Sequence, residues 1–333
     1  MNQTDIDRLH AEHWRTGYGS VAPDELTFFQ QKIVEHRPKK FIEIGTASGL
    51  SGGFIAQFMD ENGGEKFTTV DHDNTFFGDP TKPNGFLLRE IYTGSGVVIE
   101  DHTFKVAPDI PSFLDNYEMA FVDANHQHPW PLLDTLCVYP FLTGPKLVFE
   151  HDLDLYRKQD EIVWGIGPKY LYDQFPDTHR ERAEANNGNL FCLSFDLPKE
   201  KVEQIAIDAL NLPWSMRTPI PRPSLEKIRA FLAEYYSPAV LEAFDKRAQL
   251  WNRPLAGYVQ PTPPAAASAA ASAAATAPNA AKKPTVASPE ASTSDAAKTL
   301  GRAAVARVSG MLPGSMKAKV PSSVKDRIRS ALR

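Results

Sequence analysis

The stretch Phe41-Ile42-Glu43-Ile44-Gly45-Thr46-Ala47-Ser48-Gly49-Leu50-Ser51 decides the fold class of this chain. It begins as an apolar run of strand character, passes through a glycine-rich turn and continues as a helical pattern. Gly45 and Gly49 allow the backbone to turn sharply and to approach a ligand that a Cβ atom would push away. The helix after the turn offers unpaired N–H groups at its N-terminus. Such a unit is typical of nucleotide-binding sites in α/β proteins.

The segments on both sides continue the same alternation of helix and strand. Apolar residues at helical spacing alternate with short apolar and β-branched runs. A strand, a helix and a second strand in this order imply a right-handed crossover and a parallel sheet. We expect strands at residues 40–44, 66–71, 103–107, 117–123 and 146–149, and helices at residues 24–37, 50–59, 84–92, 111–114, 131–139 and 168–175.

Two segments beyond residue 175 add an antiparallel element. Residues 179–184 and 190–195 flank Asn186-Asn187-Gly188-Asn189, which is a typical hairpin turn. Helices are expected to follow at residues 199–210 and 224–251. The fold class is therefore α/β, a Rossmann-like doubly wound and mostly parallel sheet with a C-terminal antiparallel hairpin, followed by helices and a disordered tail.

The composition is that of an ordinary soluble globular protein. The chain has 333 residues, of which 42% are hydrophobic and 23% charged, and its formal net charge is −5. This balance does not favour nucleic acid as a partner. The only two cysteines, Cys137 and Cys192, lie in apolar runs, which favours buried thiols in a reducing compartment. Because we find no signal peptide and no apolar run of roughly 20 residues, we expect a cytoplasmic protein.

The C-terminal part has a different composition. Residues 259–298 are rich in Ala, Pro and Ser and cannot bury enough apolar surface to offset the entropy of ordering, which predicts a flexible linker. Residues 299–333 regain apolar residues at helical spacing and carry many Arg and Lys residues against a single acid, Asp326. Three interpretations of this basic amphipathic tail stay open: a solvated segment, a docking element for a protein partner, and a peripheral contact with an anionic membrane.

Several motifs in fixed order resemble a known family. Glu43-x-Gly45-x-x-x-Gly49-x-Ser51 is followed by Val70-Asp71, then by Val122-Asp123-x-x-His126, and then by His151-Asp152. Together they resemble class I S-adenosylmethionine-dependent methyltransferases, and most of all the metal-dependent O-methyltransferases of the catechol and macrolide-sugar type. The resemblance covers roughly residues 23–195.

The resemblance implies contacts to the cofactor S-adenosylmethionine. Glu43 is expected near its amino group, and Ser51 near its carboxylate at the helix N-terminus. Asp71 is placed to accept hydrogen bonds from the ribose hydroxyls. Asp109 corresponds to the adenine side, although loop acids are common and it could equally be solvated. The remaining expected contacts are backbone and side-chain atoms of the turn at Gly45, Thr46 and Gly49.

The resemblance also implies a metal site. Asp123 and Asp152 end neighbouring strands and offer hard oxygen ligands to Mg²⁺, which would lower the pKa of a substrate hydroxyl. The alternative is that one of them caps a helix or pairs with an arginine. His126 corresponds to the general base of related enzymes.

One departure from the family pattern follows the fifth strand, where relatives carry two acids and this chain has Glu150-His151-Asp152. His151 is therefore either a metal ligand or a residue that orients Asp152, and Glu150 is an alternative second ligand. Aromatic residues after the fourth and fifth strands, His128, Trp130, Trp164 and Tyr170, either stack on an acceptor or pack the core.

These expectations predict an O-methyltransferase, Mg-assisted, acting on a hydroxyl of a sugar, glycan or small metabolite. Two alternatives stay open: a catalytically degenerate scaffold with this fold, and an NAD(P)-dependent oxidoreductase, which the missing G-x-G-x-x-G spacing disfavours. Whether the chain forms a homo-oligomer is also open. The expected organisation is an N-terminal helical or extended segment at 1–22, the methyltransferase domain at 23–197, a helical extension at 198–258, the linker and the tail.

Overall fold

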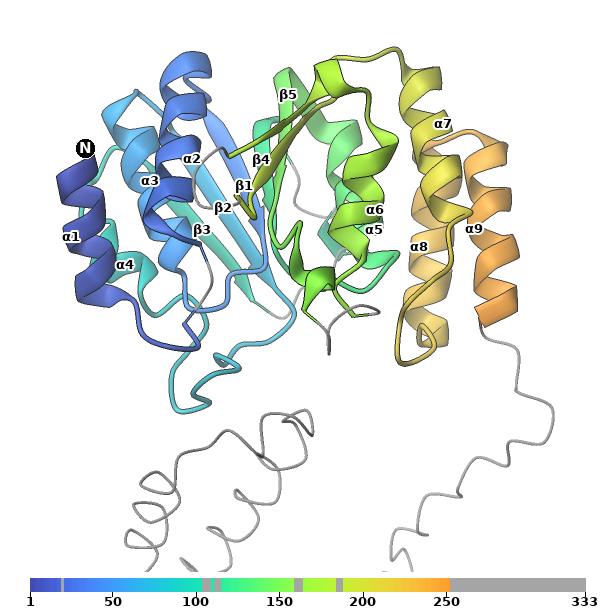
Figure 1. The fold of residues 1–333 in the computed structure, drawn as a ribbon, viewed down its shortest axis with the longest axis horizontal. Helices are drawn as coiled ribbons and strands as arrows, with labels where there is room; N and C mark the ends of the chain where they lie inside the picture. Colours follow the sequence, from blue (N-terminus) through green and yellow to red (C-terminus); the bar gives the residue numbers. More distant parts are fainter. Residues whose placement is uncertain (19–20, 104–108, 111–114, 159–163, 184–187, 252–333) are drawn as a thin grey trace, which may run out of the picture. The chain divides into compact units, whose positions relative to one another are not determined.

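Within the part of the chain that the structure describes, seven strands form one sheet in the order β3-β2-β1-β4-β5-β7-β6 (Figure 1). Strands β1 to β5 are parallel, and β7 runs antiparallel to both β5 and β6. A computed structural model describes residues 1–18, 21–103, 109–110, 115–158, 164–183 and 188–251. The strands are β1 (Lys40–Ile44), β2 (Lys66–Asp71), β3 (Val98–Thr103), β4 (Tyr117–Val122), β5 (Leu142–Glu150), β6 (Arg180–Arg182) and β7 (Phe191–Ser194).

Helices cover both faces of this sheet (Figure 1). The α-helices are α1 (Gln3–His13), α2 (Pro23–His36), α3 (Leu50–Glu61), α4 (Leu88–Ile91), α5 (Trp130–Val138), α6 (Gly167–Gln174), α7 (Lys199–Leu210), α8 (Arg222–Tyr235) and α9 (Pro238–Trp251). The short 3₁₀ turns that lie wholly within the described residues are η2 (Tyr139–Phe141), η3 (Leu155–Arg157) and η4 (Asp177–His179).

Successive residues of β1 face opposite sides of the sheet. Phe41 packs in an apolar cluster with side chains of α2 and α3, such as Phe29. Ile42 packs in a second cluster with side chains of α5 to α9, such as Leu133. Because both faces are covered, the strand is apolar after Lys40 except for Glu43, which is completely buried. A buried acid in such a strand requires polar partners.

The helices after residue 198 share the core of the sheet. Val202 of α7, Phe231 of α8 and Phe244 of α9 lie in the same apolar cluster as Ile42 and Val148 of the central strands. The described part of the predicted extension therefore packs against the sheet and shares its core.

The strand order and the antiparallel β6–β7 pair confirm the predicted fold class. The third strand, however, lies at Val98–Thr103, so the prediction of residues 103–107 was wrong by about one strand length. The reason is that β3 is an edge strand, paired only with β2, and carries charged residues such as Glu100 and Asp101. Residues 104–108 lie outside the described residues.

Two helix predictions also need correction. The helix expected at 84–92 is only the single turn α4, Leu88–Ile91. The helix expected at 224–251 is two helices, α8 and α9, because Pro238 has no N–H for a continuous helix and disfavours helical backbone at the preceding residue. The predicted turn at 111–114, the first half of the hairpin turn (residues 186 and 187), the linker and the tail lie outside the described residues.

Both cysteines are free and buried, as predicted. Among the described residues, no helix combines the length and the apolar character needed to cross a membrane.

Candidate functional site

A cavity of about 410 Å³ opens at the carboxyl ends of β1, β2 and β4. Its wall includes Gly45, Asp71 and Asp123, which directly follow or end these three strands. The cavity lies where the strand order reverses between β1 and β4, which is the usual ligand position in open parallel sheets. Its volume is in the range of small-molecule sites.

The glycine turn is built for close packing of backbone on backbone. Gly45 has φ +104°, and a Cβ there would lie 2.1 Å from the carbonyl oxygen of Asp123. Gly49 has φ +80°, and its Cβ would lie 2.8 Å from Gly85 Cα. The first glycine therefore lets the turn after β1 rest on the turn after β4, and it also forms part of the cavity wall.

Glu43, Thr46 and Ser51 form a buried polar network beneath this turn. Ser51 Oγ donates to Glu43 Oε1 (2.6 Å), and Thr69 Oγ1 donates to Glu43 Oε2 (2.7 Å). Thr46 Oγ1 lies 2.7 Å from Thr69 Oγ1. Burial, together with the nearby acids Asp123 and Asp71, raises the pKa of Glu43 to about 8 against the effect of the two hydroxyl donors. Ser51 thus contacts Glu43 directly, and Thr46 is linked to Glu43 through Thr69. None of these three predicted cofactor residues is part of the cavity wall.

Asp71 ends β2 and does face the cavity. Its Oδ2 accepts a hydrogen bond from the backbone N–H of Ala47 (3.1 Å), and its Oδ1 accepts one from that of Asp73 (3.1 Å). Although burial opposes ionisation, the His72 ring and these N–H donors lower the pKa of Asp71 below its ordinary value. The side chain is therefore an oriented, charged hydrogen-bond acceptor at the cavity wall.

Asp123, His126 and Asp152 meet beyond the ends of β4 and β5. His126 Nε2 lies 3.1 Å from Asp123 Oδ1 and 3.0 Å from Asp152 Oδ2. Their ligand atoms all lie within 4.8 Å of one another, close enough to surround a metal ion. Burial opposes protonation of His126, but hydrogen bonds to the two carboxylates dominate and raise its pKa to about 10.

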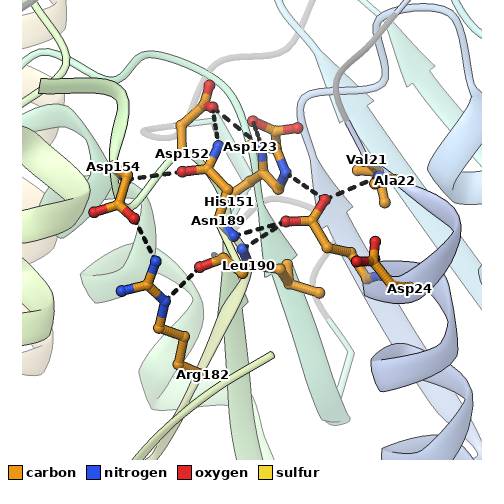
Figure 2. Close-up of polar contacts among 12 residues, drawn as sticks. Val21, Ala22, Asp24, Asp123, His151, Asp152, Asp154, Arg182, Asn189 and Leu190 are labelled. Atoms are coloured by element: carbon orange, nitrogen blue, oxygen red, sulfur yellow. Dashed lines mark hydrogen bonds and ion pairs between the residues drawn. The ribbon is translucent and has the colours of Figure 1, made fainter. Parts of the chain in front are cut away.

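His151 lies behind this cluster with both ring nitrogens facing carboxylates (Figure 2). Nδ1 is 3.4 Å from Asp152 Oδ1 and 3.9 Å from Asp123 Oδ1, and Nε2 is 3.2 Å from Glu25 Oε2. Burial opposes protonation, but the surrounding carboxylates raise the pKa of His151 well above its ordinary value. Glu25 was not among the predicted site residues.

Two other predicted residues lie away from the cluster. Glu150, the alternative metal ligand, is fully buried and accepts a hydrogen bond from Thr135 Oγ1 of α5 (2.6 Å). Burial raises the pKa of Glu150 well above its ordinary value. Asp109 pairs with Lys227 of α8, and it is not part of the cavity wall.

Asp134 on α5 is a cavity residue that the sequence motifs did not indicate. It is 6% exposed, forms part of the cavity wall, and accepts no hydrogen bond from the described residues. Burial raises its pKa to about 7 although His72 acts in the opposite direction. An acid buried in the second turn of an apolar helix would be hard to distinguish from packing by sequence alone. Its carboxyl group is available to a ligand in the cavity.

The four aromatic residues of uncertain role divide into two pairs. Trp130 and Trp164 form part of the cavity wall. His128 is buried and packs edge-on against Tyr170, with a centroid distance of 5.2 Å. His128 Nε2 lies 3.0 Å from the carbonyl oxygen of Ala209, and its Nδ1 is buried without a partner in the described part of the chain.

His128 makes the stability of the fold depend on pH. Burial, together with Arg247, lowers its pKa from 6.5 to about 4 against the effect of the Ala209 hydrogen bond. His128 therefore takes up a proton below about pH 6.5 in the unfolded chain but only near pH 4 in the folded chain. The contribution of neutral His128 to the free energy of unfolding is fully present above pH 6.5 and is lost as the pH falls toward 4. Between pH 7 and pH 5, wild type should lose about 2 kcal/mol more unfolding free energy than His128→Gln. Urea denaturation at both pH values measures the difference, and equal losses would contradict the prediction.

Comparison with known proteins agrees with this geometry. Residues 42–153 match the family model described as a methyltransferase domain, which confirms the predicted resemblance for this segment. The matched segment runs from β1 past Asp152, so it contains the glycine turn, Asp71 and the Asp123–His126–Asp152 cluster. No curated protein matches the chain.

Solved structures with a similar fold include two O-methyltransferases. One, from Bacillus cereus in complex with SAH, is 13% identical, with 58% of this chain and 90% of that chain covered and a TM-score of 0.39. The other, from Streptomyces achromogenes, is involved in tomaymycin synthesis and was solved in complex with SAM; it is 15% identical, with 58% and 88% covered and a TM-score of 0.40. Similarity at this level gives no information about the reaction of this chain.

Proposed function

We propose that this protein is an S-adenosylmethionine-dependent O-methyltransferase, assisted by a divalent metal ion, that acts on a hydroxyl of a sugar, glycan or small metabolite. The proposal depends on one observation: the cavity and the candidate metal cluster share Asp123. Asp71 and Gly45 line the same cavity as Asp123, whose carboxylate also belongs to the Asp123–His126–Asp152 cluster. The cavity proposed for the cofactor and the candidate metal site therefore adjoin, which would hold the methyl donor close to the acceptor oxygen.

The cavity residues fit an adenosine-containing cofactor. The ionised Asp71 would accept hydrogen bonds from the ribose hydroxyls, and Asp134 offers a carboxyl oxygen for an amino group. The turn at Gly45 would present backbone rather than side chain to the ligand. Glu43, Thr46 and Ser51 would act by holding this turn.

The donor atoms of the cluster fit a divalent cation. Two carboxylate oxygens suit Mg²⁺ or Mn²⁺, while an imidazole nitrogen favours a transition metal, so Mn²⁺ and Mg²⁺ are the ions to test first. A bound ion would supply Lewis-acid chemistry that lowers the pKa of the acceptor hydroxyl. The two carboxylates that raise the pKa of His126 are also the oxygen donors proposed for the ion. We propose that, with an ion in the site, the neutral imidazole would take the proton of the acceptor hydroxyl as the general base or would contribute Nε2 to the donor set.

The chain itself would supply alignment and exclusion of water. Trp130 and Trp164 line the cavity and suit an acceptor with an apolar face, such as a sugar ring or an aromatic ring. Methyl transfer is an in-line displacement, so its rate depends on holding the two reacting groups in one geometry.

Cofactor choice tests this proposal against the two alternatives. In equilibrium dialysis, the full-length chain should retain S-adenosylmethionine and should not retain NADH or NADPH. Incubation with methyl-labelled S-adenosylmethionine, Mn²⁺ and a panel of catechols and free sugars should then transfer label to an acceptor oxygen, and EDTA should stop the transfer. Retention of NADH or NADPH would support an oxidoreductase, and tight binding without transfer to any acceptor would support a scaffold.

We further propose that the protein works in the cytoplasm, where the basic tail at residues 299–333 contacts a protein partner or a membrane surface. Its excess of Arg and Lys over acids supports such a contact.

A further inference from the structure

Glu25 is a buried point of contact for three separate segments. Its Oε2 accepts hydrogen bonds from the N–H of Ala22 (2.9 Å) and from His151 Nε2 (3.2 Å). Its Oε1 accepts hydrogen bonds from the N–H groups of Asn189 (2.8 Å) and Leu190 (2.9 Å). The bond to Ala22 caps α2 in the ordinary way. The other three reach the end of β5 and the start of β7, so the side chain serves more than its own helix.

The other side of His151 contacts Asp152. His151 is completely buried, and its Nδ1 lies 3.4 Å from Asp152 Oδ1. Asn189 Nδ2 donates to the same oxygen (2.6 Å). The remaining oxygen, Oδ2, lies 3.0 Å from His126 Nε2 in the candidate metal cluster. One carboxylate oxygen is thus held by Asn189 and His151 (Figure 2), while the other contacts His126 of the cluster.

The backbone of Asp152 is held in an unfavourable conformation. Its φ is +63°, in the left-handed region, which is unfavourable for a residue with a side chain. Such a conformation persists only where surrounding contacts impose it. The contacts of Asn189 and His151 with Asp152 Oδ1 can therefore hold the carboxylate so that Oδ2 points toward the cluster.

We propose that Glu25 and His151 are positioning residues for the metal ion: Glu25 fixes the His151 ring, and the ring fixes Asp152 so that Oδ2 is presented to the ion. This inference rests on the metal site of the proposed function. Residues behind a ligand typically change metal affinity 10- to 100-fold when they are altered. The helix α2, which precedes the matched segment 42–153, is on this account part of the site.

The contrasting interpretation is that the network only fastens α2 to the sheet. It predicts a loss of stability without a change in the metal affinity of the folded protein. Thr68→Val is a matched control, because Thr68 makes a buried hydroxyl bond to Tyr117 (2.8 Å) in the same sheet and belongs to neither network. It should lower the melting temperature and leave metal affinity within about twofold of wild type.

The experiment is Mn²⁺ titration of the full-length protein, followed by the paramagnetic resonance of free Mn²⁺ at a temperature where circular dichroism shows every variant folded. We expect Glu25→Gln and His151→Gln to weaken Mn²⁺ binding by roughly 10-fold or more. His151→Asn, whose amide nitrogen approximates the position of Nδ1, should recover part of the loss. If Glu25→Gln does not fold, the two His151 variants decide.

The possible outcomes test the positioning role and the proposed metal site separately. Wild-type affinity in both Gln variants would overturn the positioning role and leave the metal site intact. Failure of the wild-type protein itself to bind Mn²⁺ or Mg²⁺ would overturn the metal site, and the positioning role with it.

Discussion

Asp71→Asn should weaken binding of S-adenosylhomocysteine roughly 100-fold, because two hydrogen bonds from ribose hydroxyls to a charged acceptor are each worth about 1.5–3 kcal/mol, and the amide loses the charge and one acceptor oxygen. Asp71 is well suited to this role. It ends β2, faces the cavity and is held in place by the N–H groups of Ala47 and Asp73. Isothermal titration of both proteins with S-adenosylhomocysteine measures the change.

Asp73→Asn is the matched control for this prediction. Asp73 lies two residues further on, lines the same cavity and has a side chain that is 58% exposed, so its charge is well screened. The same substitution there should change affinity by less than about threefold. An equal loss at both positions would mean that the general negative charge of the cavity, and not a specific contact from Asp71, binds the ligand.

Gly45→Ala should lower the free energy of unfolding by about 4 kcal/mol and abolish measurable cofactor binding. The backbone conformation at φ +104° costs a residue with a Cβ about 1–2 kcal/mol, and the collision with the Asp123 carbonyl oxygen at 2.1 Å adds about 1–3 kcal/mol. Because that oxygen belongs to the backbone, relief requires the turn after β4 to move, and Asp123 moves with it. Urea denaturation measures the first effect, and titration with S-adenosylhomocysteine measures the second.

Gly63→Ala separates the two parts of this cost. Gly63 also has a left-handed conformation, φ +77°, but the nearest atom to its Cβ would be Lys39 Nζ at 3.8 Å. Only the backbone cost applies there, so we expect a loss of about 1 kcal/mol and unchanged binding. Equal losses at the two glycines would show that contact between the β1 and β4 turns contributes nothing.

The parts of this fold that could be predicted depend on short-range patterns. The run from Phe41 to Ser51 contains its own strand, turn and helix, and the acids Asp71 and Asp123 follow apolar strands whose parallel order is fixed by the handedness of the crossover. The carboxyl ends of parallel strands meet at one edge, so the cavity position follows from the sequence. The position of the edge strand β3 could not be predicted in this way. It pairs with β2 on one side only, and its residue pattern is as polar as that of a loop.

Contacts between distant segments could not be predicted in this way. In sequence, Glu25 fits an ordinary helix cap, yet it bonds to Asn189, which lies 164 positions away in the chain. Asp134 is a single acid in an apolar helix, and only the folded structure reveals that it borders the cavity. Glu43 and Ser51 were expected at the cofactor, but the fold directs their side chains toward each other, because both lie beneath the glycine turn.

Titration of the wild-type full-length chain with S-adenosylhomocysteine is the most direct test of the central claim, that the cavity beyond β1, β2 and β4 is an S-adenosylmethionine site. We predict binding of one molecule per chain with micromolar or tighter affinity, a rise in melting temperature, and loss of both effects in Gly45→Ala. The absence of both heat and thermal stabilisation in the wild-type protein would contradict the claim.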